Sequence, residues 1–193
     1  KDGANFAGVY TTNKVTSHAI NWNLKVRRHF IKALMVNTKN ANVFTGTKGA
    51  QGLKEVAQNL AKALTLKSSQ SPEGINDVVK ITDLLFFSTG VIGEEFPAKK
   101  IINRVPELVK KLRKEQNKFV WFKAASALMT TDTRPKVAYE ETKIGNKVIK
   151  ISGVAKGSGM IAPNMATMGA MIFTDANIPS VFLKSILKKV TAT

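Results

Sequence analysis

The sequence predicts an α/β or α+β fold, because strand-like and helix-like segments alternate along it. The strand-like runs are rich in β-branched and aromatic residues and are bounded by Gly, Asn or Asp. They lie at 8–12, 31–36, 84–87, 148–154 and 170–174. Of the 193 residues, 44% are apolar, which is enough for a hydrophobic core and argues against a disordered basic chain.

The helical segments follow from apolar spacing. The clearest helix is predicted over 50–66, where one apolar stripe repeats every three or four residues, at Leu53, Val56, Ala57, Leu60, Ala61 and Leu64. A second helix is expected to start near Pro106, and two more cover 120–129 and 181–190. The only linker-like stretch, 67–74, is short, so we expect a single folded unit.

The amino-acid composition limits the catalytic groups and the partners that this chain can have. With no cysteine, the chain has neither disulfides, thiolate zinc sites nor a cysteine nucleophile, so a covalent catalyst would be Ser, Thr, Lys or a carboxylate. Lys and Arg interrupt every apolar stretch before it reaches the roughly 18 to 20 residues of a membrane span, so we expect no membrane partner. The formal charge is +17, but the basic residues spread along every predicted helix without a recognition motif. We therefore expect no nucleic-acid partner, although a non-catalytic basic binding module stays an alternative.

Two glycine-containing segments have the residue types of a site. Ser88, Thr89 and Gly90 follow an apolar strand, where a glycine lets a backbone N–H face a ligand; a strand-ending turn needs the same residues. The run 157–168 contains no charged residue, so we expect it to be buried. It holds Ala166-Thr167, and cutting that bond would leave a threonine with its own amine as base; from spacing alone, Thr167 is an ordinary strand residue.

Together these segments resemble the ornithine acetyltransferase family, also called the glutamate N-acetyltransferase family, of arginine biosynthesis. The matching blocks occur in order along most of the chain: 9–14, 36–37 with 40–42 and 45–46, 88–93, 129–133 with 135–136, and 156–168. The resemblance implies a layered α/β sandwich of the self-cleaving Thr-nucleophile amidohydrolase and acyltransferase type. Residues 1–166 would be α-chain-like, and 167–193 would begin a β chain whose remainder is absent here.

By the same resemblance, the precursor cuts itself between Ala166 and Thr167, and Thr167 becomes the nucleophile. Thr89 and Gly90 match the family's oxyanion hole, and Thr130, Lys156 and Thr167 match substrate-contacting positions. Thr167 would take acetyl from N-acetylornithine and pass it to glutamate, with no cofactor or metal. Acetyl-CoA stays open as a second donor.

The implied partners are the rest of the β chain and, in the assembled enzyme, a heterotetramer of two α and two β chains. The implied location is the cytoplasm, or the mitochondrial matrix in a eukaryote. A hydrolase or aminopeptidase on the same architecture, with water as acceptor, is the alternative enzyme.

The chain departs from the family at two positions beside these motifs. Thr38-Lys39 stand where the family usually has Ser-Gly, and Gly169 stands where it usually has Leu. We expect the first change to alter a turn near the site and the second to loosen packing behind Thr167. Only residues 168–193 follow Thr167, and without an initiator Met the chain is expected to be an incomplete member of the family, with doubtful activity alone.

Overall fold

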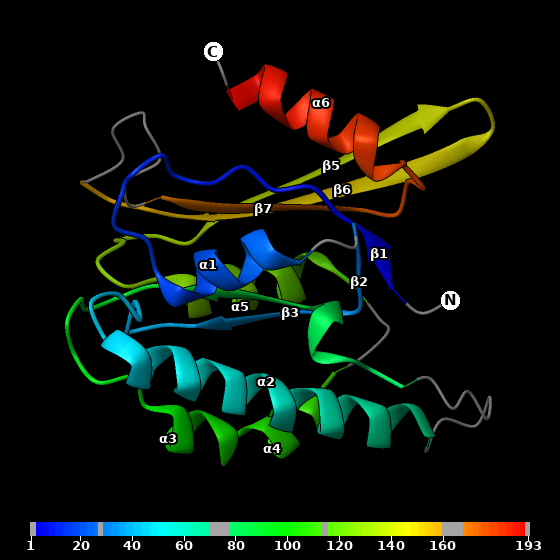
Figure 1. Ribbon diagram of the computed structural model, residues 1–193. Coiled ribbons are helices and arrows are strands. Elements are labelled where there is room, and N and C mark those ends of the chain that lie inside the picture. The colour runs from blue at the N-terminus through cyan, green and yellow to red at the C-terminus, as the bar shows by residue number, and fades with distance from the viewer. Residues whose placement is uncertain (1–2, 27–28, 70–77, 113–115, 160–167, 192–193) are drawn as a thin grey trace. The chain divides into compact units, whose positions relative to one another are not determined.

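The computed structural model describes residues 3–26, 29–69, 78–112, 116–159 and 168–191 (Figure 1). Their contacts divide the chain into two compact units. Unit 1 comprises Lys1–Ala7 and Val15–Arg113, and unit 2 comprises Gly8–Lys14 and Lys114–Thr193. This division differs from the predicted boundary at 166–167, which lies outside the described residues and stays a prediction.

Unit 1 is built around a parallel pair of strands, β3 (Ala33–Asn37) and β4 (Leu84–Ser88). The long helix α2 (Gly46–Ser69) connects them, as parallel strands require a crossover. Two short strands, β1 (Ala4–Asn5) and β2 (Phe30–Ile31), form a separate antiparallel pair. The remaining elements are α1 (His18–Lys25), the 3-10 turn η1 (Ile81–Asp83), α3 (Ala98–Ile102) and α4 (Val105–Lys110).

The core of unit 1 lies where α2 meets its neighbours. The predicted apolar stripe is buried from Leu53 to Ala61, with Leu53, Val56 and Ala57 at most 2% exposed, and Leu64 is partly buried. It packs in one cluster with Leu84 and Phe86 of β4 and with Val105 and Val109 of α4. Figure 1 shows α2 running alongside β3, with α3 and α4 on the far side of α2.

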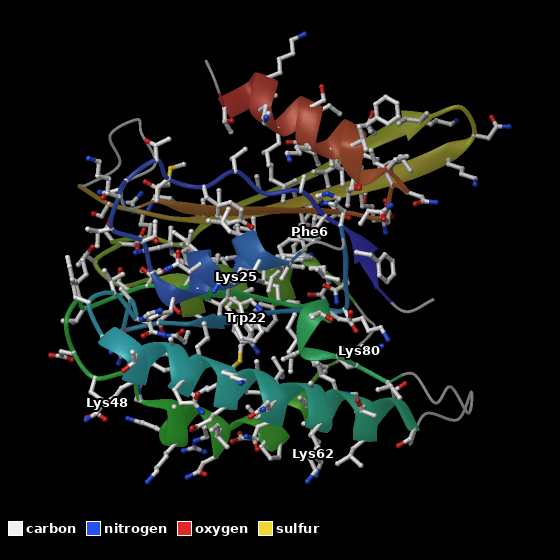
Figure 2. All side chains as sticks on the ribbon, viewed as in Figure 1. Phe6, Trp22, Lys25, Lys48, Lys62 and Lys80 are labelled. Carbon is white, nitrogen blue, oxygen red and sulfur yellow. The ribbon has the colours of Figure 1, made fainter. Side chains whose placement is uncertain are left out.

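Helix α1 fixes the middle of β4. Its N-cap, Ser17, accepts a hydrogen bond from the Ile20 N–H at 3.2 Å. The Trp22 indole donates to the Leu84 carbonyl at 3.1 Å and meets the Phe86 ring edge-on, with centroids 5.3 Å apart. Figure 2 labels Trp22 in the interior of unit 1, whereas Lys48 and Lys62 extend from α2 toward solvent.

Unit 2 contains a three-stranded antiparallel sheet in the order β5 (Lys136–Ile144), β6 (Lys147–Lys156) and β7 (Gly169–Thr174). A two-residue turn with Gly145 at φ +58° joins β5 to β6, a conformation that glycine adopts without steric cost. Helix α5 (Lys118–Leu128) contacts β5 and β6, and its Trp121 ring lies 4.8 Å from Phe173 of β7. Helix α6 (Ser180–Thr191) follows.

The predicted elements were partly wrong. Residues 8–12 form no strand, because strand preference alone does not hold extended backbone in a sheet. The predicted strand 31–36 is divided between β2 and β3. Strand β5 and helices α1 and α3 were not predicted.

Candidate functional site

One candidate site lies in unit 1, where β3 and β4 end. Asn37, the last residue of β3, is in register with Ser88, the last residue of β4. Since the strands are parallel, the segments that follow β3 and β4 leave the sheet at the same edge. Ligands of α/β sheets bind at this edge. Thr89 and Gly90 follow at once, and Thr89 is 8% exposed.

The backbone N–H groups at this edge differ in their hydrogen bonding. The Thr89 N–H donates to the Asn37 carbonyl and the Val91 N–H to the Lys39 carbonyl, each at 3.1 Å. Between them, the Gly90 N–H donates to no acceptor within the described parts of the chain. An amide left unbonded between two bonded neighbours can serve as a hydrogen-bond donor to an anionic group.

Only glycine fits at position 90. Its φ is +137°, and a Cβ there would collide with the Lys39 backbone and lie 2.5 Å from the Asn40 nitrogen. The loop therefore touches the turn after β3 directly. That turn carries Lys39 at φ +73°, a left-handed conformation that costs a non-glycine residue about 1–2 kcal/mol. This is the position where glycine was expected from the family resemblance.

Three asparagines shape this edge, and none of them was predicted to be a site residue. Asn40 is 6% exposed; its amide donates to the carbonyls of Glu94 and Glu95, and its side-chain oxygen accepts from the Asn42 N–H at 2.9 Å. Asn37 bonds both Ser88 and the Asn40 carbonyl. The signal available in the sequence was the recurrence of Asn at 37, 40 and 42 between a strand and a helix.

A separate candidate site lies in unit 2 and joins two predicted residues. Lys156, the last residue of β6, is only 4% exposed, and its Nζ donates to the Thr130 hydroxyl at 2.7 Å. A buried ammonium group beside a hydroxyl is suited to binding a carboxylate or another polar acceptor. The structure therefore brings together Thr130 and Lys156, which are 26 positions apart.

Asp132 organises this pair, although it was not predicted as a site residue. Its Oδ1 accepts from the Gly157 N–H at 2.7 Å and from Lys136 Nζ at 2.8 Å, and its Oδ2 accepts from the Thr130 N–H at 3.3 Å. Burial opposes ionisation of this carboxyl, but the bonds from Lys136, Gly157 and Thr130 outweigh it and hold the pKa of Asp132 well below its usual range. The carboxylate thus ties the 130–132 turn to the end of β6.

The remaining predicted residues, Ala166 and Thr167, lie outside the described residues. Of the run 156–168, the described positions divide: Lys156 and Gly157 are buried, whereas Met168 is 52% exposed. Thr89 and Gly90 belong to unit 1, whereas Thr130 and Lys156 belong to unit 2. In the described segments, no cluster of three or more His, Asp or Glu is arranged to hold a metal, and no helix is long and apolar enough to cross a membrane.

Comparison with solved structures supports the predicted fold class. The crystal structure of the arginine biosynthesis bifunctional protein ArgJ from Bacillus halodurans aligns with a TM-score of 0.70 at 30% identity, covering 85% of this chain and 78% of that one. Ornithine acetyltransferase from Mycobacterium tuberculosis, solved as a complex with ornithine, aligns with a TM-score of 0.65 at 26% identity, covering 86% and 78%. The α/β class is confirmed.

Sequence comparison identifies the family. The ArgJ proteins of Nitrobacter winogradskyi and Gluconobacter oxydans are each 41% identical to this chain, over 192 and 182 residues. These alignments cover 97% and 94% of the chain but only 42% and 39% of the relatives, so the chain spans about two fifths of their length. The ArgJ family model matches residues 1–193. The resemblance drawn from the sequence motifs is confirmed, and the chain belongs to the ArgJ family.

Proposed function

We propose that this chain supplies part of the active site of an acyltransferase of arginine biosynthesis, which moves acetyl from N-acetylornithine to glutamate through an acetyl-Thr167 intermediate. Membership of the ArgJ family supports arginine biosynthesis, and the likeness to ornithine acetyltransferase supports acetyl transfer as the reaction class. The observation that carries the proposal is the Gly90 N–H at the carboxyl edge of β3 and β4. Among the described residues, no group accepts a hydrogen bond from it. Acyl transfer needs such an unused hydrogen-bond donor, because the substrate carbonyl oxygen becomes negatively charged in the transition state.

The reaction proceeds in two balanced steps. The Thr167 hydroxyl attacks the acetyl carbonyl of N-acetylornithine, the threonine amine takes the hydroxyl proton, and the carbonyl oxygen becomes an oxyanion that accepts from Gly90 N–H and Thr89. The C–N bond then breaks, and the leaving amine of ornithine takes the proton. In the second step the glutamate amine attacks the acetyl ester in the same way, which releases N-acetylglutamate and restores the Thr167 hydroxyl.

Lys156 and Thr130 serve as substrate-binding groups in this proposal. Both substrates carry an α-carboxylate, and the buried Lys156 ammonium with its hydroxyl partner is a complementary cation. Asp132 stays ionised and keeps the turn that holds Thr130 in place. The mechanism uses no cofactor or metal, and acetyl-CoA as a second donor, the heterotetramer and the cytoplasmic location stay predictions.

Self-cleavage between Ala166 and Thr167 is the proposed step that exposes the threonine amine. Its test compares the full-length protein with its Thr167→Ala and Thr167→Ser variants by denaturing electrophoresis. The wild type should give two fragments, the Ala variant a single uncut chain, and the Ser variant partial cleavage, since serine retains the hydroxyl. Thr142→Ala, at an exposed position on β5, is the control and should be cut normally. Cleavage of the Ala variant at the same bond would overturn the nucleophile assignment.

Acetyl transfer is tested with N-acetylornithine in the presence and absence of glutamate. The proposal expects N-acetylglutamate to form at the rate at which ornithine is released. Thr89→Ala should lower kcat by roughly a hundred- to a thousandfold, the usual effect of removing one oxyanion donor. Release of acetate at the same rate without glutamate would instead identify a hydrolase.

A further inference from the structure

Asn37 makes two side-chain hydrogen bonds that point to two different segments. Its Oδ1 accepts from the Ser88 hydroxyl at 2.7 Å, and its Nδ2 donates to the Asn40 carbonyl at 2.8 Å. Its backbone carbonyl accepts from the Thr89 N–H at 3.1 Å. A single residue thus fixes the end of β4, the start of the loop after it, and the turn that follows β3.

This cross-link sets the position of Gly90. The Gly90 backbone lies directly against that of Lys39 and Asn40, so any shift of the turn displaces Gly90 or collides with it. The turn is also under strain, because Lys39 is held at φ +73°. A strained turn keeps its conformation only where surrounding bonds over-determine it, and the bond from Asn37 to the Asn40 carbonyl is one of these.

We propose that Asn37 is a positioning residue for the Gly90 N–H: its amide locks the turn at 37–40 against the loop at 88–91, so that the Gly90 donor has one fixed direction. The proposal rests on the proposed function, in which that N–H meets the oxyanion. An asparagine suits the role because its short side chain carries both an acceptor for Ser88 and a donor for Asn40. Aspartate keeps the first bond and loses the second.

A matched pair of variants separates positioning from stability. Asn23 of α1 makes the same two kinds of bond to the middle of β4, accepting from the Phe86 N–H at 2.9 Å and donating to the Phe86 carbonyl at 2.8 Å. Asn37→Asp and Asn23→Asp therefore each remove one donated bond from asparagine to backbone near β4. Only the first touches the turn beside Gly90.

The first measurement is amide hydrogen exchange of the full protein by NMR. In Asn37→Asp, exchange of the Val91 amide, which donates to the Lys39 carbonyl across the contact between loop and turn, should accelerate by about tenfold relative to the β4 amides, the effect of losing one net hydrogen bond. In Asn23→Asp, exchange of the Phe86 amide should accelerate, and the ratio of the Val91 exchange rate to that of the other β4 amides should stay as in the wild type. Equal ratios in both variants would overturn the proposal.

The second measurement is acetyl transfer by the same two variants. Asn37→Asp should lower kcat by about ten- to a hundredfold, as expected for a misplaced donor, with KM for both substrates unchanged. Asn23→Asp should keep kcat within about twofold, because the bond it loses lies away from the oxyanion donors. Asn37→Ala, which adds no charge, should show the same kcat loss; a normal kcat in Asn37→Ala would attribute the effect to charge and overturn the proposal. If the wild type transfers no acetyl group, the proposed function fails, and the exchange ratio alone decides whether Asn37 positions Gly90.

Discussion

Replacing Lys39 by glycine should stabilise unit 1, because this residue occupies the left-handed region with φ +73°. For an L-residue with a Cβ, that conformation costs about 1–2 kcal/mol. Glycine has no such cost, but its greater freedom in the unfolded chain gives back about 0.4–1 kcal/mol. The difference is a net stabilisation of about 0.5–1 kcal/mol.

The Lys39 side chain itself contributes little to oppose this gain. It is exposed, and it forms no hydrogen bond or ion pair with any described residue. Its backbone carbonyl accepts from the Val91 N–H at 3.1 Å, and glycine keeps that carbonyl. Removing the Cβ also brings no new atom toward Gly90.

Thermal and urea unfolding provide the assay. For a domain of this size, a gain of 0.5–1 kcal/mol corresponds to a rise in Tm of about 1–4 °C. Lys39→Ala is the control, because it removes the long side chain but keeps the Cβ and should therefore leave Tm unchanged. If Lys39→Gly were no more stable than Lys39→Ala, the strain argument would be refuted.

The other predictions concern unit 2. Asp132→Asn should lower the free energy of unfolding by about 1.5–3 kcal/mol, because it weakens charge-assisted bonds to a buried carboxylate, whereas Asp175→Asn, at an exposed position, should cost less than about 1 kcal/mol in urea titrations. Folding lowers the pKa of Asp132, so the carboxylate contributes its full stabilisation above the unfolded pKa of about 3.9. This stabilisation is lost as the pH falls below about 3.9 toward the native pKa. The Asp132→Asn variant should therefore lose less stability in acid than the wild type. Lys156→Met should raise the KM for substrate by about ten- to a hundredfold through loss of a charged hydrogen bond to a carboxylate, while Lys150→Met, on the exposed part of β6, should leave KM unchanged. An unchanged KM in Lys156→Met would remove this residue from the binding site.

Local patterns were enough for the elements whose stability is set by their own sequence. The stripe from Leu53 to Leu64 predicted the central part of α2, because helical hydrogen bonds are local and one buried face repeats every three or four residues. The apolar run 84–87 predicted β4, which is buried over most of its length. The motifs at 88–93 and 156–168 predicted the family, because several ordered blocks are specific even without a structure.

What depended on distant partners was decided only by the tertiary structure. Residues 8–12 have strand-forming side chains but are not a strand, whereas β5 is polar and mostly exposed and is a strand because β6 pairs with it. The same holds in each of the two candidate sites. Asn37 meets Ser88 across 51 positions and Asp132 meets Gly157 across 25, and no local pattern encodes either hydrogen bond. The sequence by itself determined the family and the candidate residues, and folding decided which polar groups hold those residues in place, because a hydrogen bond needs two atoms within about 3 Å that only the packed chain brings together.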